Sequence, residues 1–227
     1  MKRIFRPLPA AMVLFVFIFL GSPLGAQGFF SRLDWSFRGS ILFFPENNGL
    51  ASDSMPILPS PGGTAAYPVW GPLWAELSLD VYGTYYGYAY QLGRAVPANP
   101  ENRSSFVIGP ILGFQGLAKF DVREKIGLRV YGGLSADMRI CLIAGGLEGQ
   151  EKEQVAEEVK DITAYFWGKG RWLFPVLGFG MDFGITEKLL LGFDTRVWFP
   201  MYRLWTNEDL PAIEGWRFGV GFNFTFK

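Results

Sequence analysis

Charged side chains that recur at alternate positions within apolar segments are the residues of this 227-residue chain best placed to do chemistry. The chain has no histidine, which excludes imidazole-based triads, the commonest general base and the commonest metal ligand. The single cysteine, Cys141, excludes an intrachain disulfide and cysteine-based metal sites. Carboxylates and guanidinium groups remain. They can form ion pairs, line a polar path or, as a carboxylate pair such as Asp80 with Asp121, carry out acid–base catalysis.

The charged residues at these positions form a set that is close to neutral, with seven acidic and six basic members. A charge that is enclosed without a partner is costly, so enclosed charges must be paired or hydrated. We therefore predict a network of ion pairs, and a gated polar path is the sharper alternative. The members are Asp34, Arg38, Glu76, Asp80, Lys119, Asp121, Arg129, Asp137, Arg139, Asp182, Asp194, Arg196 and Arg217.

The spacing of these residues predicts β-strands, because apolar side chains occupy every second position between them. In a helix, Arg129, Asp137 and Arg139 would be spread around the whole circumference. High glycine content and 17% aromatic residues are also typical of one kind of β protein. The predicted strands cover 33–43, 73–81, 85–92, 106–121, 126–140, 172–183, 189–199 and 216–226.

An internal repeat indicates how these strands are connected. The segments 120–128 and 183–191 both contain a strand end, a short polar turn and an immediate strand start, and 79–85 is a weaker copy. This layout is typical of tight hairpins. We therefore expect three tight turns that alternate with four long connections, over 45–72, 95–105, 142–171 and 200–215.

Two of the long connections have a distinctive composition. The segment 45–72 holds six prolines and a Gly-Gly pair, so we expect it to be irregular and extended. In the third connection, Val155, Val159 and Ile162 have helical spacing and predict one or two helical turns at the rim of a barrel.

The two faces of the strands decide between two kinds of barrel. Eight strands enclose a space just wide enough for side chains or one small ligand, and the apolar face carries too many aromatic rings to fit there. The opposite face, of glycine, serine and balanced charges, does fit. We therefore predict an all-β fold, an eight-stranded antiparallel up-and-down transmembrane β-barrel, with short periplasmic turns and long external loops. Aromatic residues near strand ends, such as Trp35, Tyr82 and Trp198, are expected at the membrane interfaces.

The N-terminal segment has the composition of a secretory signal peptide. Three basic residues lie within the first six positions, and residues 10–20 form an apolar stretch that is too short to cross a bilayer of about 30 Å. Small residues follow, and we expect cleavage after Ala26. The sequence therefore predicts a signal peptide over 1–26 and a single exported β-barrel domain over 27–227.

With this signal peptide, strand pattern and alternation of turns and loops, the chain resembles the small bacterial outer-membrane barrels of the OmpA transmembrane domain, OmpX and OmpW type. In that group a last strand of alternating aromatic residues is the signal read by the barrel-assembly machinery. Here Phe222, Phe224 and Phe226 match it, although Lys227 follows the final Phe. The resemblance implies an outer-membrane location and, as in the OmpW type, passage of small apolar solutes.

These observations predict a non-enzymatic, monomeric protein without a cofactor or metal, which acts as a membrane scaffold or a narrow passive channel. A surface adhesin or receptor acting through the external loops is the main alternative, and a soluble ligand-binding periplasmic barrel is a third. The expected partners are outer-membrane lipid, the assembly machinery and an external ligand or host surface. Basic and acidic residues are equal in number, 21 each, which argues against nucleic acid as a partner.

Overall fold

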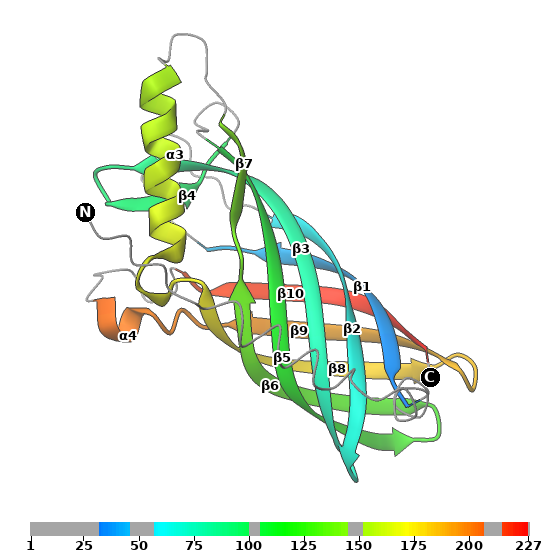
Figure 1. The fold of residues 1–227 in the computed structure, drawn as a ribbon. Coiled ribbons are helices and arrows are strands. Elements are labelled where there is room, and N and C mark those ends of the chain that lie inside the picture. Colours follow the sequence, from blue (N-terminus) through cyan, green and yellow to red (C-terminus); the bar gives the residue numbers. More distant parts are fainter. Residues whose placement is uncertain (1–31, 46–56, 100–104, 145–151, 207–214, 227) are drawn as a thin grey trace, which may run out of the picture. The chain divides into compact units, whose positions relative to one another are not determined.

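The computed structural model describes residues 32–45, 57–99, 105–144, 152–206 and 215–226 (Figure 1). The predicted signal peptide, 1–26 with its cleavage site at Ala26, lies outside the described residues. The elements are β1 (Asp34–Phe43), β2 (Ile57–Trp70), β3 (Leu73–Ala89), β4 (Arg94–Pro97), β5 (Ser105–Arg123), β6 (Ile126–Asp137), β7 (Ile140–Ala144), α3 (Lys152–Trp167), η2 (Gly168–Gly170), β8 (Leu173–Gly184), β9 (Leu189–Trp198), α4 (Arg203–Thr206) and β10 (Arg217–Phe226).

Eight of the described strands close into a barrel. The antiparallel pairs run β1–β2–β3–β5–β6–β8–β9–β10, and β10 pairs again with β1. Strands β4 and β7 pair only with β3 and β5, beyond the barrel wall. The fold class predicted from the sequence is therefore confirmed.

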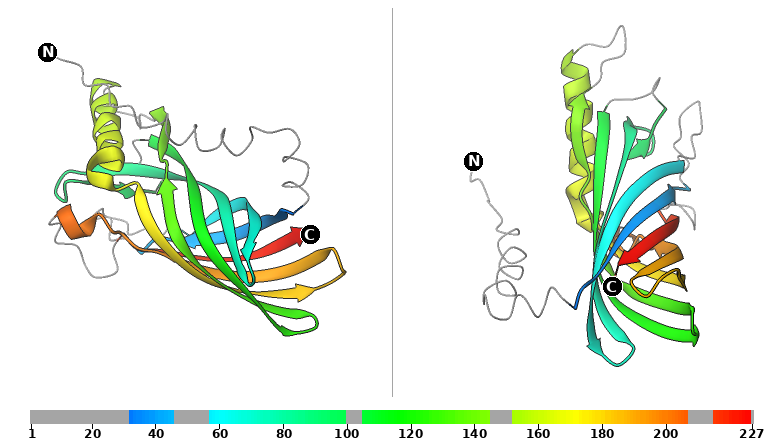
Figure 2. Two further views of the ribbon diagram at one scale, coloured as in Figure 1. Left: turned by 60° about the horizontal axis from the view of Figure 1, so that its bottom comes forward. Right: turned by 90° about the vertical axis from the view of Figure 1, so that its right-hand side faces the viewer.

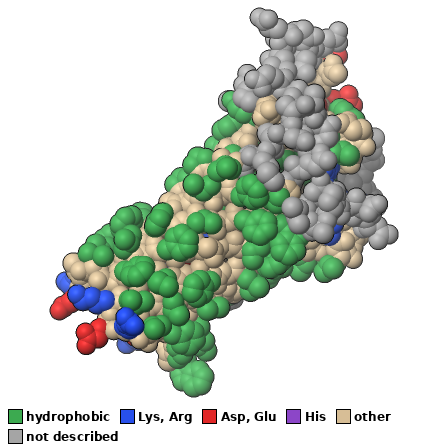
Figure 3. All heavy atoms as spheres, turned by 180° about the vertical axis from the view of Figure 1, so that it is seen from behind, with side chains coloured by type: hydrophobic (Ala, Val, Ile, Leu, Met, Phe, Trp, Pro, Cys, Tyr) green, Lys and Arg blue, Asp and Glu red, His purple; other side chains and the backbone are tan. Residues whose placement is uncertain are grey.

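The wall has the polarity that a lipid surrounding requires, with apolar side chains outside and polar ones inside. Strand β10 alternates without a break, so that Phe222 is 59% exposed whereas its neighbour Asn223 is 0% exposed. Strand β1 follows the same rule: Phe37 is exposed and Arg38 is buried. Hydrophobic side chains spread over the wall in Figure 3, whereas the charged side chains that are visible lie towards its two ends. So large an exposed apolar surface is typical of a protein that contacts a membrane.

The prediction that 45–72 forms an irregular loop is wrong for its second half, because Ile57–Trp70 is the barrel strand β2, while 46–56 lies outside the described residues. The prolines of β2 are tolerated because of how this strand pairs with its neighbours. Pro59 and Pro61 lie where β2 pairs with β1 alone, since the pairing with β3 begins only at Gly62. Proline lacks a backbone N–H, and on the side of a strand that has no partner this missing donor breaks no hydrogen bond between strands. Pro68 lies next to a register irregularity, the other position where strands accept proline.

The strands predicted over 73–81 and 85–92 are one continuous strand, β3, so the tight turn expected within 79–85 is also wrong. Gly83 does not mark a turn there. A Cβ at Gly83 would lie 2.8 Å from the ring of Phe106 on β5, so the glycine allows close packing. The true hairpin is formed by Gly71 and Pro72, and Gly71 has a positive φ of 52°, which glycine adopts readily.

The other two predicted hairpins, β5–β6 and β8–β9, are confirmed. The three hairpins lie at one end of the barrel, which we call the turn end, and the long connections lie at the other, the loop end (Figure 1). The number of barrel strands is still eight, as predicted, because the two errors cancel. The strand β2 lies in an expected loop, and the two strands expected over 73–81 and 85–92 are the single strand β3.

Two strands continue past the barrel at the loop end. Strands β3 and β5 have 17 and 19 residues, whereas a tilted strand needs roughly 9–11 to cross a bilayer. Their outer parts, with β4, β7 and α3, form what we call the loop-end platform. Helix α3 has 16 residues, longer than the one or two turns predicted, and stands beside β7 in Figures 1 and 2. Among the described residues, no helix is long and apolar enough to span a membrane.

Candidate functional site

The barrel lumen holds an ion-pair layer halfway along its length. Arg38 on β1 lies 3.1 Å from Asp194, 3.3 Å from Asp80 and 3.9 Å from Glu76. Arg196 on β9 donates a hydrogen bond of 2.5 Å to Asp80 and another of 3.0 Å to the Ser40 hydroxyl. The side chains of Arg38, Asp194 and Arg196 are 0% exposed. We call Arg38, Glu76, Asp80, Asp194 and Arg196 the charged layer.

An apolar layer lies next to the charged layer, on the side of the loop end. It forms because the inward-facing phase of several strands changes from polar to apolar towards that end. On β1 the phase of Arg38 and Ser40 continues with Leu42 and then Phe44, and both of these are buried. We call the buried cluster of Leu42, Phe44, Leu58, Tyr82, Ile111, Phe174, Val176, Trp198 and Tyr202 the apolar layer.

The apolar layer is tied to polar groups at both of its faces. The Tyr82 hydroxyl donates to the Asp137 carboxylate at 3.1 Å, and the Trp198 ring nitrogen donates to Ser135 at 3.3 Å. The same Asp137 carboxylate pairs with Arg139 at 3.0 Å and with Arg217 at 2.5 Å. One carboxylate thus serves two guanidinium groups near the loop end.

Towards the turn end the lumen opens into a vestibule of about 580 Å³. Two ion pairs line it: Lys119 with Asp34 at 2.6 Å, and Arg129 with Asp182 at 2.8 Å. The Lys119 ammonium also lies 3.6 Å from the centre of the Trp74 ring. Water can enter this vestibule, but the charged layer lies beyond it.

The structure brings together most of the residues predicted for the network. Twelve of the thirteen take part in the ion pairs described above, in three groups along the lumen. Asp121 does not belong with them, because it is exposed at the turn end of β5 and lies apart from Asp80. The residues matched to the assembly signal, Phe222, Phe224 and Phe226, all face outward. Their role in assembly stays a prediction.

Sequence reasoning missed the apolar layer. Tyr82 and Trp198 were expected at the membrane interfaces, but both are 2% exposed and lie inside the lumen. The sequence did indicate the inward position of Trp198, because it follows Asp194 and Arg196 at every second position of β9 and so shares their face. Arg94 and Arg171, which line the lumen mouth, lie outside any long alternating segment, so the sequence carried no such signal for them.

The loop-end platform has a small core of its own. Ile162 and Phe166 of α3 are buried against Tyr86, Ala95 and Val107 of the sheet. The Tyr86 and Phe166 rings meet edge to face at 4.9 Å. These contacts hold α3 on the sheet by burial of apolar surface.

The outward part of α3 is acidic, and its carboxylates interact with Tyr88 and Tyr90 at the end of β3. The backbone N–H of Tyr88 donates to Glu158 at 2.8 Å. The pKa of Tyr90 is raised from its ordinary value by partial desolvation and by the carboxylates of Glu158, Asp161 and Glu157. The platform therefore presents a negative field beside exposed aromatic residues.

The described residues include no group of three acidic or cysteine side chains placed to hold a metal ion. No family model matches the sequence, and no curated protein matches it either.

Three solved structures are similar in fold. Neisserial surface protein A is 12% identical, with a TM-score of 0.48, over 86% of this chain and 95% of that one. The attachment invasion locus protein Ail of Yersinia pestis is 6% identical, with a TM-score of 0.41, over 86% and 94%. A de novo designed transmembrane β-barrel is 9% identical, with a TM-score of 0.38, over 85% and 93%.

Proposed function

We propose that this protein is a non-enzymatic, monomeric barrel of the bacterial outer membrane whose lumen is closed, and that it anchors the loop-end platform at the cell surface. The observation that carries the proposal is the pair of packed layers across the lumen. A water-filled channel needs a continuous polar path, and the side chains of Arg38, Asp194 and Arg196 leave no exposed surface in the middle of this one.

The membrane location rests on the wall. Exposed residues such as Phe37, Phe114 and Phe222 lie on three different barrel strands, so the apolar surface surrounds the barrel. Only a closed barrel or a helix satisfies all backbone groups in lipid, and this chain uses the barrel. The expected signal peptide and the outward-facing Phe222, Phe224 and Phe226 support export and insertion by the barrel-assembly machinery.

The platform supports a surface role better than a transport role. Its sheet and helix extend past the part of the wall that a membrane covers, and they have their own buried core. Loops and extensions on a rigid scaffold often carry binding function. We propose an external ligand or a host surface as the partner of the platform, and lipid as the surrounding of the wall.

The experiment that tests the closed lumen is single-channel conductance in planar bilayers, with heat-shifted gel mobility to show that the barrel is folded. We expect no conductance steps from the natural protein. Two variants provide a matched comparison: Trp198→Ala removes a lumen side chain, and Trp35→Ala removes an outward-facing one. Both should stay silent, because the charged layer still closes the lumen in each.

Regular steps from the folded natural protein would contradict the closed lumen. If Trp198→Ala enlarged those steps and Trp35→Ala did not, the lumen itself would be the pore, and the narrow-channel alternative would replace our proposal.

A further inference from the structure

The three hairpins at the turn end of the barrel differ in charge. Arg123 and Glu124 lie exposed at the β5–β6 hairpin, and Glu187 and Lys188 lie exposed at the β8–β9 hairpin. The β2–β3 hairpin, by contrast, has no charged side chain over residues 64–75. Two of the hairpins therefore carry side chains that favour water, and the third does not.

The tip of the β2–β3 hairpin exposes large apolar side chains instead. Trp70 is 79% exposed, Val69 is 65% exposed and Leu73 is 45% exposed. The register between β2 and β3 shifts between Pro68 and Trp70, which leaves Val69 unmatched on β3. Such an irregularity can re-aim side chains out of the usual alternation, and here the consecutive residues Val69 and Trp70 are both exposed. We call residues 69–73 the uncharged tip.

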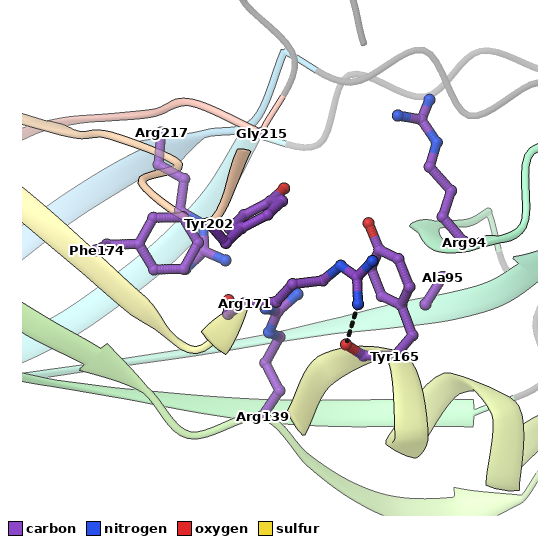
Figure 4. A pocket seen from close by; sticks show the side chains of 9 residues that line it. All are labelled: Arg94, Ala95, Arg139, Tyr165, Arg171, Phe174, Tyr202, Gly215 and Arg217. Atoms are coloured by element: carbon purple, nitrogen blue, oxygen red, sulfur yellow. Dashed lines mark hydrogen bonds between the residues drawn. The ribbon is translucent and has the colours of Figure 1, made fainter. Parts of the chain in front are cut away.

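The inner side of this hairpin faces water. At the loop end, side chains from several elements converge in the lumen mouth and leave about 10 Å³ of free space, among them Arg139, Arg217 and Tyr202 (Figure 4). The turn end is open, and Gly71, Pro72 and Trp74 line its vestibule of about 580 Å³. Successive side chains of a strand point to opposite faces, so Leu73 lies on the outer face of β3 and Trp74 on the inner one.

The outer side of the uncharged tip continues the lipid-facing wall. Leu73 is followed on the outer face of β3 by Leu77 and Leu79, which are 58% and 43% exposed. Trp35 on the neighbouring strand β1 is 48% exposed. The apolar surface of the wall thus reaches the end of the barrel at this hairpin.

The β2–β3 and β8–β9 hairpins lie on opposite sides of the barrel. In the closed sheet, β5 and β6 separate them in one direction, and β10 and β1 separate them in the other. On the β8–β9 side the wall ends in Thr186, Glu187 and Lys188, which are exposed. The turn end is therefore apolar on one side and charged on the other.

We propose that the uncharged tip is a one-sided membrane anchor, which lies in the boundary between headgroups and acyl chains of the surrounding leaflet while the other two hairpins stay in water. Tryptophan favours this boundary, because its ring is apolar and its N–H needs a polar partner. The turn backbone at Gly71 needs hydrogen-bond partners that the hydrocarbon core lacks, so the tip stops at the boundary. Because β3 is continuous from Leu73 to Ala89, the anchor holds the strand that carries the loop-end platform.

The experiment measures how a spin label at position 69 meets dissolved oxygen and a polar nickel complex, in vesicles of dioleoylphosphatidylcholine with both reagents on both sides of the bilayer. The label is attached to Val69→Cys in a Cys141→Ser background, which leaves Trp70 in place. A label on Glu187→Cys, at the opposite hairpin, is the matched reference. We expect the nickel complex to relax the label at 69 about fivefold less than the label at 187, because a polar complex leaves water only at a cost. Oxygen should relax the label at 69 more.

A second pair of variants tests whether Trp70 is the anchoring side chain. Trp70→Ser, added to the variant labelled at 69, should raise the access of the nickel complex to the label about twofold or more, because the ring no longer favours the boundary. Trp205→Ser removes a tryptophan that is 52% exposed at the loop end, and it should leave this access unchanged. Heat-shifted gel mobility shows that each variant is folded.

Equal access of the nickel complex to the labels at 69 and 187 overturns the anchor, because the tip then lies in water, where a soluble protein could cover it. A label at 69 that meets neither reagent also overturns it, because the tip is then covered by protein, such as a second copy of this chain. The absence of a response to Trp70→Ser, or an equal response to Trp205→Ser, overturns the assignment to Trp70. None of these results depends on whether the lumen conducts.

Discussion

At the scale of single residues, Arg38 is the side chain on which the charged layer depends. It lies within 3.9 Å of three carboxylates, from Glu76, Asp80 and Asp194, and nothing of it is exposed. Replacing a buried charge that has several partners costs more than losing the pair itself, because the partners are left uncompensated.

We therefore expect Arg38→Gln to lower the free energy of unfolding by about 3–5 kcal/mol. The matched control is Arg123→Gln, which removes the same group from an exposed position at the turn end and should change stability by about 0.5 kcal/mol or less. Urea unfolding in phospholipid vesicles, followed by gel mobility, measures both. Equal effects of the two substitutions would show that the charged layer does not stabilise the barrel.

The inward-facing charged residues of the lumen were predictable because alternation in one strand fixes which side chains share a face. Asp34 and Arg38 needed only the two-residue period of β1. The partner of each charge was not predictable, since Arg38 meets Asp80 and Asp194 across strands that are distant in sequence. Asp121 followed the period but lies where β5 leaves the barrel, so its phase no longer means burial.

At the scale of elements, β2 and α3 show two different limits of sequence reasoning. Prolines such as those of β2 normally argue against a strand. Pro59 and Pro61 are accepted here because β3 does not pair with this part of β2. That pairing is a property of the whole sheet and cannot be read within the segment. Helix α3 was detected from three apolar residues, but the sequence did not show that it extends to Phe166, whose ring meets Tyr86 on β3.

We expect Ile162→Asp to detach α3 while the barrel stays folded, because Ile162 is 0% exposed in the core of the platform. Limited trypsin cleavage within α3 should become about tenfold faster or more, as local opening becomes easier. Ala164→Asp, at an exposed position of the same helix, should leave cleavage unchanged. Loss of heat-shifted mobility in Ile162→Asp would contradict the separation of platform and barrel.

At the scale of the whole molecule, the polarity of the barrel wall is the premise of every functional statement above. The volume argument from the sequence correctly placed the aromatic residues outside, because an eight-stranded lumen cannot hold them. It did not foresee that the loop-end part of the lumen is also apolar, with Trp198 and Phe44 inside. The lumen has room for some large side chains, and the strands place them just beyond the charged layer.

The most direct test of this inside-out arrangement is the accessibility of a spin label at position 222, in the middle of β10, for the protein refolded into lipid vesicles. The label is attached to Phe222→Cys in a Cys141→Ser background, and a label at the exposed turn-end residue Asp121 is the reference. We predict that the label at 222 relaxes with dissolved oxygen and not with a water-soluble nickel complex, and that the label at 121 does the opposite. A label at 222 that meets the nickel complex as readily as the one at 121 would contradict the membrane barrel and favour a soluble one.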